Sequence, residues 1–331
     1  MKAWLVEKLG DPIDVLEYKD TADPVVHPGM VKVKVLAAGL NFPDILLCQG
    51  KYQATPTMPF TPGVEVCGEI VELGEGVTNW KVGDRVFGGP HSDAGAGGGY
   101  AEYAVMQADG IFAVPDGMPA EEAAGYLLTY QTSWVALHTR GQIKAGDVVL
   151  VHAGAGGVGS AAIELAKAAG ATVIATAGGP EKKKILTELG ADIAIDYNSE
   201  DFVQVVKDAT GGRGADIIYD PVGGDVYDKS TKCIAFEGRI LIIGFTSGRM
   251  AQAATNHILI KNYSVVGVHL GYYKSMRPEV IPEADAALSK LHADGKIKPY
   301  ISKVYKMSEL PEALVALGGR KTTGKVVVVP D

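Results

Sequence analysis

Cysteine is scarce in this sequence, and long apolar runs are missing from it. The 331 residues contain three cysteines, Cys48, Cys67 and Cys233, and none forms a C-x-x-C pair. Such spacing indicates reduced thiols rather than a disulfide framework. No apolar run approaches the roughly 18 residues that a membrane helix needs. Residues 1–6 lead straight into a strand pattern without the apolar stretch of a signal peptide, so we expect a cytoplasmic protein.

Positive charge is also in deficit. The formal net charge is −8, whereas a nucleic-acid-binding face needs clustered cations to neutralise phosphates. The one dense basic run, Lys182 to Lys184, is of a kind that most often forms the solvated face of a helix. The composition therefore argues against nucleic acid as the main partner.

Glycine, in contrast, is abundant. The chain has 42 glycines, against a usual frequency of about 7%. They occur in separate turns rather than in a repeat, which indicates many tight connections between strands and helices. A chain of this length also exceeds the usual size of one hydrophobic core, so we expect two domains.

The rhythm of the sequence changes near residue 121. Before it, short strand-like segments alternate with Pro-Gly, Gly-Asp and Gly-Gly turns. After it, the pattern predicts strands at 148–152, 172–176, 193–195, 216–219, 239–243 and 264–268, and helices at 160–169, 181–189, 201–209 and 226–235. Strands and helices that alternate at this spacing predict a doubly wound parallel sheet. The last 60 residues return to a helix and strands, which suggests a discontinuous domain around the α/β unit.

A glycine-rich segment directly follows the apolar strand at 148–152. Gly154, Gly156 and Gly159 form a G-x-G-x-x-G motif, with Gly157 and Val158 between the last two glycines. A pyrophosphate must approach backbone N–H groups at the positive end of a helix, and a Cβ would block that approach. The strand before and the helix after the motif favour dinucleotide binding over a merely structural glycine turn.

The end of the next strand bears on the choice of cofactor. NAD enzymes usually carry an acidic residue there, which binds the ribose 2′-hydroxyl. This strand ends in Thr176, Ala177 and Gly178, and Lys182 follows within one helical turn. The missing carboxylate suits the 2′-phosphate of NADPH, although Glu181 lies close by in the sequence.

Many segments of the chain resemble the zinc-independent quinone oxidoreductases, relatives of ζ-crystallin in the medium-chain dehydrogenase/reductase superfamily. Besides the glycine-rich loop, these segments are Asn41-Phe42-Pro43-Asp44, Gln49-Gly50-Lys51-Tyr52, Pro62-Gly63-Val64-Glu65, Val82-Gly83-Asp84-Arg85-Val86, Leu128-Thr129-Tyr130, Asp220-Pro221-Val222-Gly223-Gly224, Ile243-Gly244-Phe245 and Thr323-Gly324-Lys325. The resemblance covers essentially the whole chain. It implies an α/β fold with an NADP-binding Rossmann domain at 125–265. A discontinuous β-rich, GroES-like catalytic domain is expected at 1–124 and 266–331.

The resemblance also implies which positions form the site. Residues expected to line the nicotinamide and substrate are Asn41, Asp44, Tyr52 and Thr129. Those expected around the adenosine 2′-phosphate are Gly178, Lys182, Tyr197 and Arg320, and those beside the nicotinamide amide are Gly244 and Phe245. The segment 88–99 departs from the family pattern because it is longer and richer in glycine. We interpret it as a flexible lip.

Zinc-dependent relatives need a cysteine early in the segment that reads Asn41 to Asp44 here, and a histidine where this chain has Val64. Without these ligands three protein donors cannot be assembled, so no metal is expected. Without a metal to act as a Lewis acid, oxidation of an alcohol loses its usual route. Electron-poor compounds that accept hydride readily are therefore the expected substrates. The resemblance thus implies an NADPH-dependent reductase of quinones or small enones, and a homodimer formed through the strand at 264–268.

Alternatives remain open. The chain could be a 2-enoyl-CoA (acryloyl-CoA-like) reductase in which Tyr52 protonates the substrate, or Tyr52 could merely shape the cleft. Asp44 could orient the nicotinamide or cap the helix that follows it. Glu65 is expected to be a buried, paired carboxylate. A non-catalytic NADPH-binding protein, structural or RNA-binding as some ζ-crystallin relatives are, is the third possibility, which the acidic charge disfavours.

Overall fold

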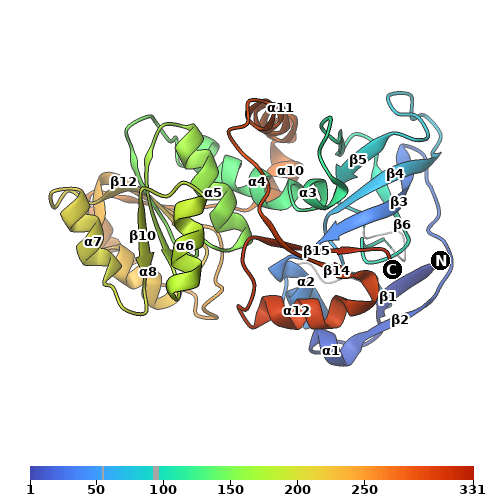
Figure 1. Cartoon of the computed structure of the whole chain (residues 1–331), viewed down its shortest axis with the longest axis horizontal. Coiled ribbons are helices and arrows are strands. Elements are labelled where there is room, and N and C mark those ends of the chain that lie inside the picture. The colour runs from blue at the N-terminus through green and yellow to red at the C-terminus, as the bar shows by residue number, and fades with distance from the viewer. Residues whose placement is uncertain (54–55, 92–96) are drawn as a thin grey trace. The chain divides into compact units, whose positions relative to one another are not determined.

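The structure is a computed structural model that describes residues 1–53, 56–91 and 97–331. It separates into two compact units (Figure 1). The first unit comprises Met1–Leu128 and Pro299–Asp331, and the second comprises Thr129–Lys298. The second boundary lies later in the chain than the expected 265/266, because the two helices after the last Rossmann strand group with the second unit. No helix among the described residues is long and apolar enough to span a bilayer.

The first unit is built on strands. Its elements are β1 (Lys2–Val6), α1 (Pro12–Val15), β2 (Leu16–Asp20), β3 (Met30–Gly39), α2 (Phe42–Cys48), β4 (Val66–Leu73), β5 (Arg85–Gly88), β6 (Tyr103–Gln107), β7 (Ile111–Ala113), α3 (Ala120–Ala124), β14 (Ile301–Lys306), η2 (Met307–Glu309), α12 (Leu310–Gly318) and β15 (Lys325–Val329). The seven-stranded sheet runs β14-β15-β3-β4-β5-β7, and β6 also pairs with β3. β15 therefore joins the C-terminal segment to the middle of a sheet made mostly from the first 113 residues.

The second unit is the expected doubly wound fold. Its elements are α4 (Leu127–Trp134), η1 (Val135–Arg140), β8 (Val148–Val151), α5 (Gly157–Ala168), β9 (Thr172–Ala177), α6 (Pro180–Glu188), β10 (Ile193–Asp196), α7 (Phe202–Ala209), β11 (Ala215–Asp220), α8 (Gly224–Ser230), β12 (Ile234–Ile242), α9 (Thr255–Lys261), β13 (Ser264–Gly267), α10 (Leu270–Met276) and α11 (Val280–Ala293). All pairings in the order β10-β9-β8-β11-β12-β13 are parallel. The strand order reverses between β8 and β11, where ligands bind in such sheets.

Burial explains why the apolar patterns predicted this sheet. Three of the four β8 residues, Val149, Leu150 and Val151, are fully buried, as a central parallel strand requires. Seven of the 12 residues of α5 are buried against the sheet. β13 pairs only with β12 among the described strands and forms the edge, as expected.

One predicted helix is too long. The sequence pattern predicts a helix at 226–235, but α8 ends at Ser230 and β12 begins at Ile234. Ile234 pairs with Ala215 of β11, and the Ala215 N–H donates to the carbonyl of Cys233 at 2.8 Å. The register then shifts before Ile217. The apolar residues at 234–235 match a helical period, but they belong to a bulged strand. Burial beside β11 outweighs the local preference for helix.

Part of the predicted lip is packed backbone. Gly98 and Gly99 are buried, and a Cβ on Gly98 would stand 1.9 Å from the carbonyl oxygen of Thr61. The Gly99 N–H donates to the Gly63 carbonyl at 2.8 Å. These glycines allow two backbone segments to lie side by side, so the lip interpretation is wrong for them. Residues 92–96 of the same segment lie outside the described part of the chain.

Candidate active site

The glycine-rich loop joins β8 to α5, and the surroundings of its three motif glycines show why a side chain is excluded at two of them and what the third leaves open. A Cβ on Gly154 would stand 2.7 Å from Leu186, and one on Gly159 would stand 2.2 Å from the carbonyl oxygen of Ala153. These two glycines therefore permit tight packing inside the unit. A Cβ on Gly156 would meet only the Ala153 carbonyl, at 3.3 Å. Gly156 thus leaves backbone accessible to a ligand.

The first turn of α5 offers N–H groups at this loop. Gly156 is the N-cap and has no side chain to accept from the turn, which begins with Gly157, Val158 and Gly159. The N-terminus of a helix favours anions because its N–H groups and its dipole both point outward. The loop and the helix start therefore fit a pyrophosphate, as the motif predicts.

His152 fixes the base of the loop. Its ring nitrogens lie 3.1 Å from Thr176 Oγ1 and 2.8 Å from Ser230 Oγ, so it links β8 to β9 and α8. Burial lowers the pKa of His152 to about 3. The ring is neutral at neutral pH and acts in packing and hydrogen bonding rather than as an acid catalyst.

Two of the residues predicted around a 2′-phosphate, Gly178 and Tyr197, lie together at the end of β9. A Cβ on Gly178 would stand 2.6 Å from the hydroxyl oxygen of Tyr197, so glycine is needed for the tyrosine to cover this position. Tyr197 follows β10 and is half exposed, at 52%. Lys182 is the third residue of α6, whose N-cap is Gly179. Arg320 belongs to the other unit, in the turn after α12, where its φ is 57°.

Asp196 is the residue here that the sequence reasoning missed. Its Oδ1 accepts from the N–H groups of Gly179 at 2.8 Å and Asn198 at 3.0 Å. These backbone bonds hold the pKa of Asp196 below its usual value. The carboxylate therefore positions Tyr197, which precedes Asn198, beside the end of β9. Its place at the carboxyl end of the strand next to β9 was the available signal.

The loops that follow β11 and β12 lie against each other at the carboxyl ends of these strands. The Thr246 N–H donates to the Pro221 carbonyl at 3.1 Å, and a Cβ on Gly223 would stand 2.9 Å from the ring of Phe245. Gly244 and Phe245, predicted beside a nicotinamide, are thus held by the Asp220 loop. Phe245 keeps 40% of its surface exposed.

In the first unit, Asn41 and Asp44 form the start of α2. Asp44 Oδ2 accepts from the Asn41 backbone N–H at 2.8 Å and from the Tyr100 hydroxyl at 2.7 Å, and its Oδ1 accepts from the Gly63 N–H at 3.2 Å. Asp44 is fully buried, and desolvation raises its pKa to about 6. Its geometry is that of a capping carboxylate.

Asn41 is held at both ends of its amide. Its Nδ2 donates to Glu65 Oε1 at 2.9 Å, and its Oδ1 accepts from Lys325 Nζ at 2.7 Å. Lys325 also forms a short ion pair with Glu65, and both side chains are almost fully buried. Glu65 is therefore buried and paired, as expected. Lys325, which the sequence reasoning did not single out, links β15 to the segment around α2.

Tyr52 packs on the edge of the first unit's core and keeps part of its surface exposed. Burial, and then the charge of Asp44, raise the pKa of the Tyr52 phenol above its usual value. The phenol therefore remains protonated at neutral pH. Thr129, the first residue of the second unit, is buried in α4 with 3% of its surface exposed.

The positions where zinc-dependent relatives carry ligands hold Asn41 to Asp44 and Val64. Within residues 1–53, 56–91 and 97–331, no three histidine, cysteine, aspartate or glutamate side chains gather as a metal-binding group. All three cysteines are buried, and desolvation raises the pKa of Cys67 to about 11. A thiol at that pKa is a poor ligand, because the thiolate is the metal-binding form.

Comparison with known proteins decides the family. Two family models match, one described as alcohol dehydrogenase GroES-like domain over residues 27–116 and one described as zinc-binding dehydrogenase over residues 157–288. The chain is 37% identical over 328 residues to the quinone oxidoreductase-like protein 2 homolog of Nematostella vectensis, which covers 99% of this chain and 88% of that protein. The chain belongs to the quinone oxidoreductase-like branch of the medium-chain dehydrogenase/reductases.

Solved structures of this superfamily match over the whole length. Escherichia coli quinone oxidoreductase, solved in complex with NADPH, has a TM-score of 0.91 and 30% identity, and the match covers 100% of both chains. CurK enoyl reductase has a TM-score of 0.88 and 28% identity, with 100% of this chain and 99% of that chain covered. The predicted fold class, a Rossmann unit with a β-rich GroES-like unit, is confirmed.

Proposed function

We propose that this quinone oxidoreductase-like protein is a zinc-free, NADPH-dependent reductase of quinones or small α,β-unsaturated carbonyl compounds. The observation that carries the proposal lies at the carboxyl ends of the Rossmann strands. There no side chain covers the backbone of the Gly154–Gly159 loop at Gly156. In addition, β9 contains no carboxylate, and Tyr197 lies against the residue that follows this strand. The NADPH found in the Escherichia coli relative supports this choice of cofactor.

In this proposal the chain's own residues bind and orient the reactants. Gly157 and Val158 would hold the pyrophosphate by backbone N–H groups, Tyr197 and Lys182 would hold the 2′-phosphate, and Gly244 and Phe245 would lie beside the nicotinamide. NADPH supplies a hydride when bound. Reduction of a quinone then consumes one hydride and one proton and yields the hydroquinone and NADP⁺. Water can supply the proton, because the reduced quinone oxygen is basic and its protonation needs no positioned acid.

A specific observation favours a second candidate, an enoyl-thioester reductase. Reduction of an enone or enoyl thioester places the proton on carbon, which needs a positioned acid. The protonated phenol of Tyr52 is available for that role, and CurK enoyl reductase shares the fold.

One measurement separates these functions. We expect NADPH oxidation at 340 nm with a quinone panel, slower oxidation with alkenals, and little with enoyl-CoA thioesters. Preference for the thioesters would replace the first proposal with the second. NADPH binding without turnover of any acceptor would instead mean a non-catalytic NADPH-binding protein.

Lys182→Ala should weaken NADPH binding roughly ten- to a hundredfold, because a charge-assisted hydrogen bond contributes about 1.5–3 kcal/mol. NADH lacks the phosphate, so its dissociation constant should barely change. Both constants are measured by fluorescence titration of the reduced nicotinamide. Lys184→Ala is the matched control, since Lys184 lies on the same helix, pairs with Glu188 and is not among the residues predicted around the phosphate. Equal losses for both cofactors would mean that Lys182 supports only the fold.

Removal of divalent metal ions should leave the reductase activity unchanged. The reason is the residue set at the zinc-ligand positions, where Val64 replaces the imidazole that a zinc site needs. The test is NADPH oxidation before and after dialysis against a chelator, with the metal content measured in parallel. Stoichiometric zinc that leaves together with the activity would refute a zinc-free mechanism.

We also propose a homodimer through β13. This edge strand carries Val265 and Val266, both partly exposed, and an uncovered apolar edge pairs readily with a second copy about a two-fold axis. Size-exclusion chromatography coupled to light scattering, at micromolar concentration, should give twice the 34.7 kDa mass of one chain. A mass of one chain contradicts the dimer.

A further inference from the structure

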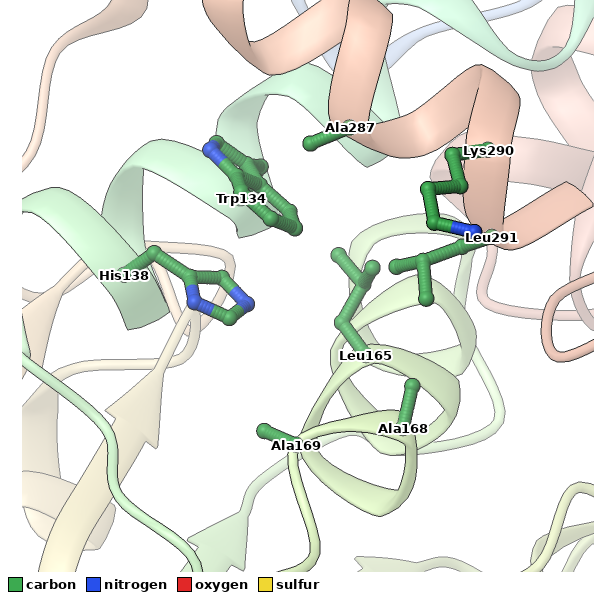
Figure 2. A pocket seen from close by; sticks show the side chains of 8 residues that line it. All are labelled: Trp134, His138, Leu165, Ala168, Ala169, Ala287, Lys290 and Leu291. Atoms are coloured by element: carbon green, nitrogen blue, oxygen red, sulfur yellow. The ribbon is translucent and has the colours of Figure 1, made fainter.

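A cavity of about 230 Å³ lies inside the second unit, at the end of α5 opposite the glycine-rich loop (Figure 2). Leu165 and Ala168 of α5 form one side, and Ala287 and Leu291 of α11 form another. Trp134 of α4 and His138 of η1 complete it. Because alanine and leucine side chains line the α5 and α11 sides, the cavity is almost wholly apolar.

His138 brings a polar atom into these apolar surroundings. Its Nε2 is buried and, among the described residues, has no hydrogen-bond partner. Figure 2 shows this nitrogen pointing into the cavity. Burial lowers the pKa of His138 to about 4, so the ring is neutral at neutral pH. A buried polar atom without a partner is unfavourable, and a ligand that bonds to it removes that cost.

The aromatic pair gives the cavity a flat wall. The rings of Trp134 and His138 are stacked, with centroids 3.8 Å apart and planes inclined by 22°. A planar ligand can lie against such a wall with many carbon contacts. An engineered apolar cavity of about 150 Å³ already binds benzene, so the larger cavity here has room for a substituted ring.

We propose that this cavity binds a small, uncharged aromatic molecule that carries a hydroxyl group. A hydroxyl both donates and accepts, so it satisfies Nε2 in either neutral tautomer of His138. A carboxylate fits poorly, because the one cation at the cavity among the described residues, Lys290, already pairs with Asp294 at 2.9 Å. The site is independent of the proposed nucleotide site, which lies at the other end of α5.

The experiment compares p-cresol with p-xylene, which have nearly the same shape but differ in the hydroxyl. Full-length protein saturated with NADPH is titrated with each probe, and ¹H–¹⁵N spectra follow the Trp134 indole and the His138 ring. We expect both probes to shift these signals, and p-cresol to bind roughly three- to tenfold more tightly than p-xylene because of one added hydrogen bond.

Variants make the test specific. His138→Phe keeps an aromatic ring and should equalise the two affinities. Ala287→Leu fills the cavity and should weaken both probes at least tenfold, whereas Ala286→Leu, on the exposed face of the same helix, should change neither. If p-cresol leaves the Trp134 and His138 signals unmoved, or binds Ala287→Leu as well as the unaltered chain, the proposal is overturned. If Ala287→Leu does not fold, His138→Phe decides alone: an unchanged preference for p-cresol overturns the proposal.

Discussion

Tyr52→Phe should lower kcat by about 100-fold or more with an enone or enoyl-thioester substrate, if Tyr52 is the proton donor. Burial and the charge of Asp44 raise the pKa of the phenol, so it is protonated at neutral pH and a proton is present for transfer. With a quinone the loss should be small and appear mostly in KM, since water protonates the reduced oxygen. Steady-state kinetics with both acceptors measure the difference.

The control for this variant is Tyr18→Phe. Tyr18 lies in β2, stacks on Trp4 with ring centroids 5.0 Å apart, and loses the same oxygen atom outside the predicted site. It should leave kcat unchanged with either acceptor. A large kcat loss for Tyr52→Phe with a quinone would contradict the proposed mechanism, because that proton has an easy alternative donor.

Lys325→Met should reduce the free energy of unfolding of the first unit by about 3–5 kcal/mol. The reason is that Glu65 would remain buried and charged without its partner, while Asn41 Oδ1 and the Leu40 carbonyl would each lose a donor. Urea unfolding monitored by tryptophan fluorescence measures the loss. A Trp134→Phe background leaves Trp4 and Trp80 as reporters of the first unit alone.

Two further variants test the cause. Lys306→Met removes an exposed lysine from the neighbouring strand β14 and should change stability by less than about 0.5 kcal/mol. Adding Glu65→Gln to Lys325→Met should recover part of the loss, because the uncompensated charge disappears. A loss below about 1 kcal/mol in Lys325→Met alone would show that the buried pair contributes little.

The Rossmann unit could be predicted because its signals are local. A continuous apolar strand, three spaced glycines and an apolar helix follow one another within 152–169, and each reports on burial or close approach at its own position. The glycine geometry shows that Gly154 and Gly159 permit close packing, whereas Gly156 leaves room. Local signals failed at 226–235, where one apolar pattern fitted both a helix and a bulged strand, and they did not predict α9.

Long-range partners could not be predicted in this way. Asp196 bonds to Gly179 across two strands, and Lys325 pairs with Glu65 across 260 positions of sequence. The sequence marked Asn41 and Asp44 as site residues by resemblance, but their roles depend on these partners. Their side chains form hydrogen bonds inside the first unit, and these bonds stabilise the start of α2. Their part in catalysis stays a prediction.

The buried pair between Lys325 and Glu65 also bears on how the protein forms during synthesis. Glu65 leaves the ribosome early, but its counter-charge arrives on β15, after the whole second unit has been made. The second unit is continuous in sequence, so it can fold as soon as residue 298 emerges, ahead of the half-built first unit. Until then the Ala38–Gly39 end of β3 lacks its partner β15 and Glu65 lacks its counter-charge, so the first unit is completed only after the second unit has been made.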